Sequence, residues 1–493
     1  MRILHTSDWH LGRTLEGISR LNEQADFIDF ICRMVDEERI DLVIIAGDIY
    51  DTYNPPAAAE NLFYKALAGL NDNGARAVIV IAGNHDNPER LCAAAPLLSK
   101  SGIILLGRPS SKAEVSSYNR DNGVNDDKRD KSSISDNSSN GDKSNNGSNG
   151  DKSDNGDNGD KSSNGDNGDK SDNSGNNDIN INSYIGKRIN SIENYNHKHN
   201  NSGVKIVRSD SGFVELFLRS CGQGAVILTL PYPSESRLLE LLNDEADERD
   251  LRKAYSQKIG TIFNNLAGHC RKDTVNLATG HFFVLGGHVS DSERTLQVGG
   301  ALSVDPADLP EGVQYLALGH LHRPQRVKTA KCHTYYSGSP LAYSFSESNH
   351  AKAVYIVDVD PGAEPTVNAV YVACGKPLRK WVAERGPEQA VEWCKAGKDH
   401  GCWVDIEIHS DRVLLNEEYR RLRELHDGIV SIRVKTPESM SESEDYADRE
   451  GMKIEDLFSD FYKFRTGEEI DEGMMSAFLE VVNTDPEVEE HEA

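Results

Sequence analysis

Five short segments of the sequence place residues that can bind metal ions directly after an apolar stretch. The segments are Asp8-Trp9-His10, Gly47-Asp48, Gly83-Asn84-His85-Asp86, Gly280-His281 and Gly319-His320-Leu321-His322. The carboxyl ends of buried strands deliver side chains to a shared crevice on a rigid backbone. The glycines allow tight turns that re-aim the next side chain. We therefore expect the five segments to converge on one site.

The candidate metal ligands combine oxygen and nitrogen donors. They are Asp8, His10, Asp48, Asn84, His281, His320 and His322. Such a mixed set suits two divalent cations of the manganese, iron or zinc type better than magnesium or calcium. Two ions need a shared ligand, and Asp48, which follows the most apolar strand, is the expected bridge.

Each segment alone is a weak signal, because a histidine after a strand is more often a structural residue. The five together, in this order and each after a strand, favour a metal site. Asp51 and Asp86 are expected to brace their turns, and Trp9 to pack in the core. A structural role is also expected for the histidines outside the motifs, which are His5, His269, His288, His333 and His350.

The elements that must position these residues alternate between strands and helices. Apolar runs predict strands at 2–6, 41–46, 77–82, 225–230, 275–279 and 315–318. Helical spacing of apolar residues predicts helices over 21–35 and 59–70, and a long polar helical stretch runs from 234 to about 268. These patterns predict an α/β (α+β) sandwich of two sheets flanked by helices.

The C-terminal third follows a different pattern. Short strands are expected at 354–359, 367–373, 403–408 and 429–434, which predicts a small α+β domain over residues 351–436. The tail, residues 437–493, contains two short amphipathic helices, with apolar faces at 454–461 and 474–482. These faces suit docking into the groove of a partner protein. The alternative is that they fold back onto the core of their own chain.

Residues 111–202 consist almost entirely of Asn, Asp, Ser, Gly and Lys, and a nine-residue unit that begins Gly-Asp-Lys-Ser recurs within them. Nothing there can offset the entropy of ordering, so we expect a disordered low-complexity insertion. A fragment at 151–156 resembles the front half of a calcium loop, but Ser162 stands where a bidentate glutamate is needed. Weak cation binding is the alternative. The insertion interrupts one domain, formed by residues 1–110 plus 203–350.

Composition excludes several classes of protein. The chain has 493 residues, and its eight cysteines form no C-x-x-C pair, so neither a disulfide framework nor a structural zinc site is indicated. No apolar run approaches the roughly 18 residues of a membrane span, and the N-terminal residues lack the apolar core of a signal peptide. We expect a cytoplasmic protein that is neither secreted nor embedded in a membrane.

The net charge of −26 taken alone argues against a nucleic-acid partner, because binding to phosphates favours a basic surface. Much of this charge is in the tail, where residues 437–493 include 19 acidic and 4 basic residues. Residues 119–202 include 15 acidic and 11 basic residues. The rest of the chain, with a net charge of −7, is compatible with a phosphodiester substrate.

The series D-x-H, GD, GNHD, GH and GHxH resembles the motifs of the calcineurin-like binuclear metallophosphoesterases. Four further stretches resemble the Mre/SbcD group of that family. They are MRILHTSDWHLG, GDIYDTYNPP, ALGHLHRPQ followed by YYSGSPLAYSFSE, and WVDIEI. The resemblance covers nearly all of the chain except about 110–202.

This resemblance implies roles for eight side chains. One manganese ion would be held by Asp8, His10, Asp48 and His322. The second would be held by Asp48, Asn84, His281 and His320. The remaining residue, His85, would act on the scissile phosphate without binding metal.

The resemblance also implies a DNA nuclease, with 3′–5′ exonuclease activity on double strands and endonuclease activity on single strands and hairpins. It would act in DNA repair, recombination and replication, near the nucleoid. Residues 351–436 would be a capping domain, although a purely structural role is equally compatible with the sequence. The tail would dock on an SbcC-type ATPase, within a heterotetramer that contains a homodimer of this chain.

Two other functions are compatible with the motifs. The same metal core occurs in small-molecule phosphodiesterases and protein phosphatases, against which the extra C-terminal domain and tail argue. A non-catalytic tether for DNA ends is the other alternative, against which the complete set of seven ligands and His85 argues.

Overall fold

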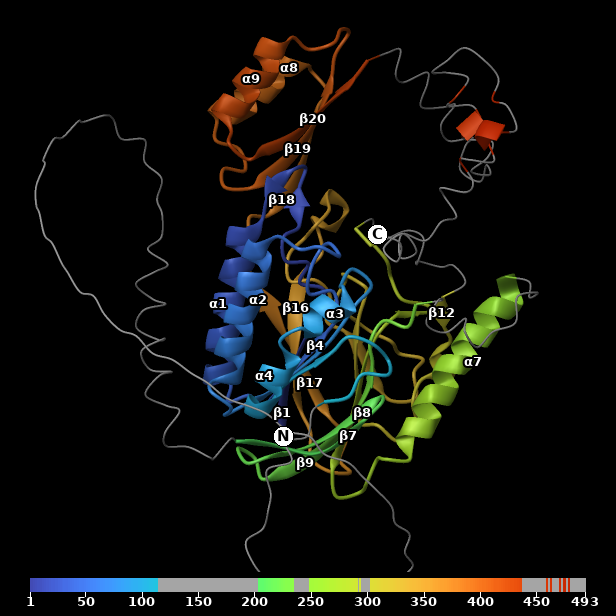
Figure 1. The fold of residues 1–493 in the computed structure, drawn as a ribbon. Coiled ribbons are helices and arrows are strands. Elements are labelled where there is room, and N and C mark those ends of the chain that lie inside the picture. Colours follow the sequence, from blue (N-terminus) through green and yellow to red (C-terminus); the bar gives the residue numbers. More distant parts are fainter. Residues whose placement is uncertain are drawn as a thin grey trace, which may run out of the picture. The chain divides into compact units, whose positions relative to one another are not determined.

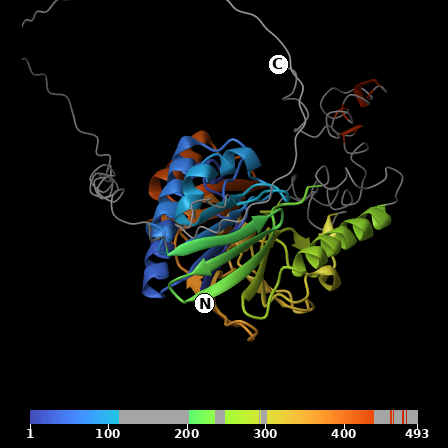
Figure 2. The same ribbon diagram turned by 60° about the horizontal axis from the view of Figure 1, so that its bottom comes forward.

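Two β-sheets lie face to face, and helices cover their outer sides (Figures 1 and 2). The computed structural model describes residues 1–113, 203–234, 248–290, 292–293 and 302–436, together with 458, 459, 462, 470, 473–475 and 478. The arrangement confirms the predicted α/β class. The insertion expected at 111–202 lies outside the described residues from 114 onward, as do most residues of the two expected tail helices.

The first sheet has six strands in the order β17-β16-β1-β4-β5-β6. In that order their bounds are Thr366–Val372, Lys352–Asp358, Arg2–Thr6, Leu42–Ala46, Ala77–Ile81 and Ile103–Leu106. β1, β4, β5 and β6 are parallel, whereas β16 is antiparallel to both of its neighbours. The carboxyl ends of β1, β4 and β5 therefore lie along one edge.

The second sheet has seven strands in the order β14-β15-β13-β10-β9-β8-β7. Their bounds are Gln325–Arg326, His333–Tyr336, Tyr315–Gly319, Val275–His281, Gln223–Leu230, Phe213–Leu218 and Val204–Asp210. β15, β13, β10 and β9 are parallel. Two small pairs accompany the sheets, β2 with β3 (Thr14–Leu15, Ile18–Ser19) and β11 with β12 (Phe283–Val284, Ser303–Val304).

The central strands of the first sheet are buried on both faces, which explains why their sequences are apolar throughout. In β4, Val43 and Ile45 belong to the apolar cluster beneath the helices. Leu42 and Ile44, which point the other way, belong to the cluster between the two sheets. Burial of one such aliphatic side chain contributes about 1.5–3 kcal/mol. This double-sided packing holds the strand ends in place.

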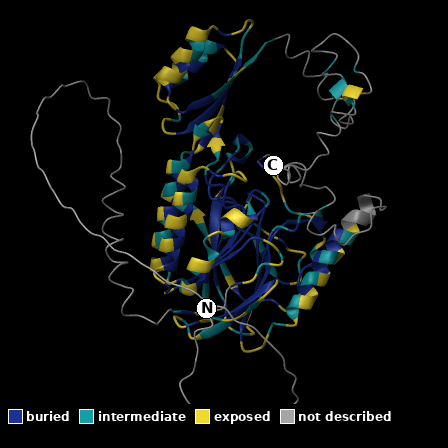
Figure 3. Ribbon diagram, viewed as in Figure 1, coloured by how far each residue is buried: buried dark blue, intermediate teal, exposed yellow. Residues whose placement is uncertain are grey.

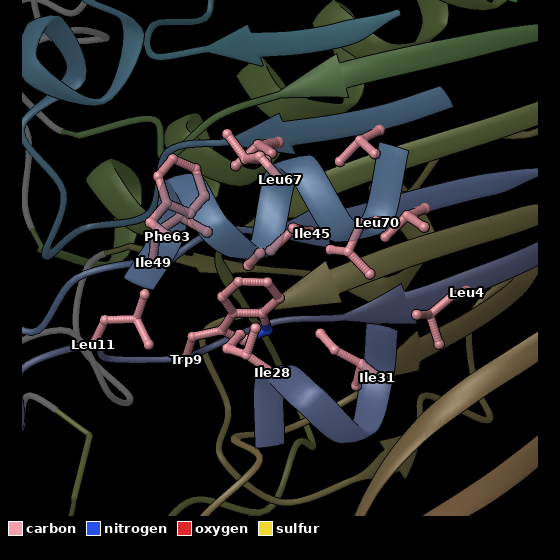
Figure 4. Packing of buried hydrophobic residues seen from close by; sticks show 14 of the residues in the cluster. Leu4, Trp9, Leu11, Ile28, Ile31, Ile45, Ile49, Phe63, Leu67 and Leu70 are labelled. Atoms are coloured by element: carbon pink, nitrogen blue, oxygen red, sulfur yellow. The ribbon is translucent and has the colours of Figure 1, made fainter. Parts of the chain in front are cut away.

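Helices α1 (Leu21–Glu37) and α2 (Ala57–Asn71) cover the first sheet, and their apolar faces interdigitate with it (Figure 4). α7 (Glu248–Ala267) covers the second sheet with Ile259 and Phe263, which lie one turn apart. Figure 3 shows α1 and α2 striped by exposed residues and the strands largely buried. The short helices α3 and α4 are Pro88–Cys92 and Ala95–Leu98. None of the helices in the described part of the chain has the length and apolar character needed to cross a bilayer.

The strand pairing places the boundary between the two domains later in the chain than the expected residue 351. The strands expected at 354–359 and 367–373 are β16 and β17, and they extend the first sheet. β16 pairs with the edge of β1, whose backbone groups need partners, and its Val354 and Ile356 complete the cluster beneath the helices. The phosphoesterase part therefore continues beyond residue 350, to the end of β17.

The small domain begins with β18 (Leu378–Ala383), which pairs in parallel with β19 (Trp403–His409), itself parallel to β20 (Ile429–Lys435). Helices α8 (Pro387–Lys395) and α9 (Asn416–Leu425) pack on this sheet around a separate apolar cluster. An α+β unit is therefore present, but it starts later than the sequence pattern indicates.

The buried carboxylate of Glu23, in α1, joins the small domain to the phosphoesterase part. It accepts hydrogen bonds from Arg20 Nε and Nη2, both at 2.7 Å. It also accepts hydrogen bonds from Trp403 Nε1 and the backbone N of Lys376, both at 2.8 Å. Trp403 packs in a small cluster with Phe345. Since buried donors need acceptors, this carboxylate helps, together with that apolar cluster, to fix how the two parts meet.

We expect Trp403→Phe to lower the free energy of unfolding by about 1.5–3 kcal/mol, because it removes a hydrogen bond to a charged acceptor while it keeps an aromatic ring. Urea denaturation of the full-length protein measures this change. Trp393→Phe is the matched control, because Trp393 packs against Trp381 within the small domain. Equal destabilisation by the two substitutions would contradict the role of the Trp403–Glu23 hydrogen bond in joining the two parts.

Candidate metal centre

The structure brings all seven candidate ligands together at adjoining edges of the two sheets. The first sheet supplies those that follow β1, β4 and β5, namely Asp8, His10, Asp48 and Asn84. The second sheet supplies those at the carboxyl ends of β10 and β13, namely His281, His320 and His322. Six of these side chains are buried, and Asn84 is half-buried.

One group of ligand atoms comprises Asp8, His10 and His322, whose atoms all lie within 4.8 Å of one another. The Nε2 atoms of His10 and His322 are 3.0 Å apart. Asp8 Oδ1 accepts a hydrogen bond of 2.9 Å from the backbone N of His320, and its Oδ2 accepts one of 2.5 Å from Ser7. These bonds orient a carboxylate of the first sheet toward ligands of the second.

A second group surrounds Asn84, whose Oδ1 lies 2.9 Å from His281 Nε2 and 3.0 Å from His320 Nδ1. Asp48 lies between the two groups. Its Oδ2 is 3.4 Å from His281 Nε2 and 3.7 Å from His10 Nε2. This intermediate position is the one that a bridging ligand would require.

The spacing and chemistry of these atoms fit divalent cations. Two ligand atoms at about 2.1 Å from one octahedral cation lie about 3 Å apart. The His10–His322 pair has this spacing, and so do both contacts of Asn84. The orientation of His281 also fits, because its Nδ1 lies 2.8 Å from the carbonyl oxygen of Ala46 and its Nε2 faces the site.

Four of these residues adopt a left-handed backbone, which is rare for residues with a side chain. They are Asp8, His10, Asp48 and His320, with φ of 52°, 45°, 49° and 103°. Each such conformation costs about 1–3 kcal/mol and persists only where the surroundings enforce it. The surroundings here include hydrogen bonds from the backbone N of Asp8 to Gly47 O and from the backbone N of His10 to Asp48 O, both 3.0 Å.

Two glycines of the motifs are required by the closeness of the ligands. A Cβ on Gly83 would lie 2.1 Å from Asp48 Oδ1. A Cβ on Gly47, which also has a φ of +90°, would lie 2.3 Å from His281 Nδ1. The motif glycines therefore make room for the ligands of the neighbouring segment, in addition to allowing turns.

Opposite charges stabilise the ionised forms of Asp48 and His281. Burial alone would raise the pKa of Asp48, but the charges of His281 and His85 and a hydrogen bond from His281 hold that pKa well below its usual value. Burial alone would lower the pKa of His281, but the charge of Asp48, a hydrogen bond to it and the charge of Asp8 raise that pKa to about 9.

Burial dominates at three other ligands. It lowers the pKa of His320 to about 3, with a contribution from the charge of His281. It also lowers the pKa of His10 well below its usual value, aided by the charge of His85. Burial raises the pKa of Asp8 to about 6. Neutral imidazoles such as His10 and His320 are the form that binds metal ions.

His85 lies beside the clustered ligands. Its ring centroid is 4.7 Å from that of His10, and its Nδ1 is 2.7 Å from the carbonyl oxygen of Asp51. The backbone N of His85 donates a hydrogen bond of 2.9 Å to Asp48 Oδ1. Only 8% of the surface of His85 is exposed, so a substrate could contact this side chain only if it entered the site.

The bracing role expected of Asp86 and the packing role expected of Trp9 agree with the observed contacts, whereas the carboxylate of Asp51 lies 3.6 Å from His10 Nδ1 and 3.4 Å from Arg13 Nη1. Asp86 accepts hydrogen bonds from three backbone N atoms of its own turn and of the turn after β4. Trp9 is buried in the cluster beneath the helices, and its Nε1 donates to Thr6. His5 is buried against Tyr315. In the described part of the chain, the histidines outside the motifs do not belong to the groups of clustered ligand atoms.

Sequence motifs do not single out the polar side chains that surround His322. These are Ser292, Glu293, Glu347 and Lys352. Glu347 ends the stretch YYSGSPLAYSFSE, which carries part of the family resemblance. This stretch could therefore have indicated that Glu347 lies near the site. Ser292 belongs to none of the motifs, and only the folded structure brings it to the site.

Comparison with known proteins agrees with this geometry. Residues 1–162 match the family model of calcineurin-like phosphoesterases, and residues 374–466 match that of the type 5 capsule protein repressor C-terminal domain. The chain is 37% identical, over 494 aligned residues that cover 100% of both proteins, to the SbcD component of nuclease SbcCD from Bacillus subtilis (strain 168). The chain belongs to the SbcD family of nucleases. It is therefore a metal-dependent hydrolase that acts on DNA.

Membership of the SbcD family confirms the resemblance that the motifs indicate, and with it the nuclease class. The second matched region begins at residue 374, after β17 and just before β18. This start agrees with the later domain boundary given by strand pairing.

We expect Gly83→Ala to weaken the binding of Mn²⁺ by about tenfold or more, because its Cβ would displace Asp48 from the position between the two ligand groups. Isothermal titration with Mn²⁺ measures the affinity. Gly268→Ala is the control, because a Cβ there meets only the backbone oxygen of Asn265 at 3.5 Å. Unchanged Mn²⁺ affinity in Gly83→Ala would show that the site does not depend on this close approach.

Proposed function

We propose that this SbcD-family nuclease hydrolyses phosphodiester bonds in DNA with two manganese ions. The first ion would be held by Asp8, His10, Asp48 and His322. The second would be held by Asp48, Asn84, His281 and His320. Asp48 would bridge the two.

One observation carries this proposal. A single carboxylate oxygen, Asp48 Oδ2, lies within 3.7 Å of imidazole nitrogens from both ligand groups, His10 on one side and His281 on the other. His10 follows β1 of the first sheet, and His281 ends β10 of the second. A carboxylate that is shared between two groups of this kind supports a centre for two cations.

Two divalent cations at such a centre would clamp a phosphate and lower the pKa of a bound water toward neutrality. The chain itself supplies orientation and charge. The carbonyl of Ala46 holds the ring of His281, and the backbone N of His320 holds the carboxylate of Asp8. Burial of six of the seven ligands excludes bulk water, which strengthens their interaction with charge.

His85 would act on the scissile phosphate without binding metal. Because Nδ1 is fixed by the carbonyl of Asp51, Nε2 is the atom suited to proton transfer. A protonated imidazole there would stabilise the charge that develops on the phosphate, or protonate the leaving 3′ oxygen. The positive charge of His85 contributes to holding the pKa of Asp48 below its usual value.

The proposed activity is 3′–5′ exonucleolytic on double strands and endonucleolytic on single strands and hairpins, in DNA repair, recombination and replication. The small domain would position DNA over the metal centre. Two contacts in the first turn of α1 support this role of the small domain. Glu23 accepts a hydrogen bond from Trp403 of the small domain, and Gln24 Nε2 donates one of 2.8 Å to the backbone oxygen of His10. Adjacent residues therefore connect the small domain and the metal centre.

A partner protein is also part of the proposal. The name of the Bacillus subtilis relative describes it as one of the subunits of SbcCD. We infer that this chain likewise works with an SbcC-type ATPase at the nucleoid, as a homodimer within a heterotetramer. The tail supports this, because Phe458 stacks on Phe478 at 3.6 Å and Met474 is 45% exposed. Exposed methionines suit contacts with a partner helix.

We expect His85→Gln to bind Mn²⁺ with parental stoichiometry and to lower kcat by about 10²–10⁴-fold, because it removes proton transfer and leaves the ligands in place. Asp48→Ala is expected to lose both ions. Isothermal titration and cleavage of DNA measure these effects. Parallel assays with a chromogenic phosphodiester distinguish a DNA nuclease from a small-molecule phosphodiesterase.

His269→Gln is the matched control, because His269 stacks on Phe213 away from the ligand groups. It should leave both binding and cleavage unchanged. Cleavage at the parental rate by His85→Gln would refute the role of His85. Parental Mn²⁺ stoichiometry in Asp48→Ala would refute the bridge.

A chain that ends before Lys453 should cleave a hairpin duplex with Mn²⁺ at the basal rate, but should lose co-purification with an SbcC-type ATPase and stimulation by ATP. The reason is that the apolar faces of the tail would be gone, whereas the metal centre would be intact. Phe478→Asp in the full-length chain tests the same contact by placing a charge on the apolar face.

The alternative, in which the tail packs on its own core, makes a different prediction. Truncation would then lower the melting temperature of the chain, and the basal cleavage rate would fall with it. Circular dichroism melts of the truncated chain distinguish the two.

A further inference from the structure

Three buried polar residues form a row of contacts behind His322, on the side of its ring that faces away from His10. They are Ser292, Glu347 and Lys352, which are 7%, 1% and 7% exposed. We call this row the Ser292 relay. Buried ionic groups of this kind cost free energy unless they are fully paired, and packing alone would not select them. Their position next to a candidate ligand therefore points to a purpose in the site.

The contacts of the relay are continuous. Ser292 Oγ lies 2.5 Å from His322 Nδ1 and donates a hydrogen bond to one carboxylate oxygen of Glu347. The other carboxylate oxygen is paired with Lys352 Nζ. Lys352 Nζ also donates to the backbone oxygen of His322 at 3.0 Å and to Ser339 Oγ at 2.8 Å. The relay thus returns to the residue from which it starts.

The direction of the hydrogen bonds follows from counting protons. A carboxylate paired with lysine is an acceptor only, and a serine hydroxyl has a single proton to donate. Ser292 gives that proton to Glu347, so toward His322 it can only accept. His322 therefore has a proton on Nδ1, and Nε2 is the ring nitrogen that faces His10 Nε2, at 3.0 Å.

His322 needs such support more than His281 does. His281 ends β10, and a backbone carbonyl of the neighbouring sheet holds its Nδ1. His322 lies three residues beyond the end of β13, in a loop. Side chains also hold its backbone there, because its N donates a hydrogen bond of 2.7 Å to Glu293 Oε1.

We propose that Ser292 and Glu347 are positioning residues, which set the tautomer and orientation of His322 so that its Nε2 can bind a divalent cation. Lys352 keeps Glu347 an acceptor. This inference rests on the proposed two-cation function and names how one ligand of that site is prepared.

Titration of the full-length protein with Mn²⁺ tests the relay. Ser292→Ala should weaken one of the two Mn²⁺ sites by about 10–100-fold, the usual effect of losing a group that orients a ligand. The other site should change by less than about twofold, because its ligands do not contact the relay. Ser292→Thr, which retains the hydroxyl, should restore the affinity. In the same way, excess Mn²⁺ should restore the cleavage rate of Ser292→Ala.

Ser256→Ala is the matched control. Ser256 is also a buried serine that donates to a carboxylate, with Oγ 2.5 Å from Asp308 Oδ2, but it is part of helix α7 and does not belong to the ligand groups. It should leave both Mn²⁺ affinities unchanged, which separates the loss of the relay from the loss of a buried serine hydrogen bond.

Glu347→Gln gives a second test that does not depend on the folding of Ser292→Ala. The amide of glutamine can donate to Ser292, whose proton would then point to His322 Nδ1 and drive the ring proton onto Nε2. We expect the same weakening of one Mn²⁺ site. In ¹⁵N spectra of the histidine-labelled, metal-free variant, one ring should change from the Nδ1-protonated to the Nε2-protonated form.

The relay would be refuted if Ser292→Ala and Glu347→Gln both bound two Mn²⁺ ions with parental affinity. It would also be refuted if the spectra showed no change of tautomer. Failure of the proposed function is distinguishable, because the parental protein would then bind fewer than two ions, or Asp48→Ala would bind as the parental protein does.

Discussion

Hydrogen bonds across the facing edges of the two sheets hold the metal centre together. His281 Nδ1 contacts the carbonyl of Ala46 at 2.8 Å, and the backbone N of His320 donates to Asp8 at 2.9 Å. Away from the ligands, the backbone N of Tyr232 donates to the carbonyl of Ala82 at 3.0 Å. These bonds fix where one sheet stands relative to the other. Ligands that belong to different sheets can therefore lie within 4 Å of one another.

The candidate metal centre destabilises the folded chain, and the apolar burial in the sheets around it offsets this cost in free energy. Left-handed backbone at Asp8 and Asp48, together with buried charge, destabilises the folded chain. Strands such as β4, which are apolar on both faces, supply the burial that offsets this cost. The favourable free energy of core burial thus outweighs the unfavourable free energy of forming the site.

Local sequence predicts the parts of this arrangement that depend on strand ends. The convergence of the candidate ligands at the ends of β1, β4, β5, β10 and β13 could be predicted because apolar strands and glycines mark where the chain turns. The pattern does not say which sheet a strand joins, so β16 and β17 are wrongly placed in the small domain. Ser292 is also missed, because its partners His322 and Glu347 lie 30 and 55 residues away in the sequence.

The distribution of ligands along the chain has a consequence for biosynthesis. Asp8 emerges from the ribosome early, whereas β10, β13 and their three imidazoles emerge only after the long low-complexity segment. A nascent polypeptide thus holds the candidate ligands of the first sheet without the three imidazoles of the second until His322 has been translated. We expect no DNA cleavage by incomplete translation products, because a fragment that stops before the second sheet lacks three of the seven candidate ligands.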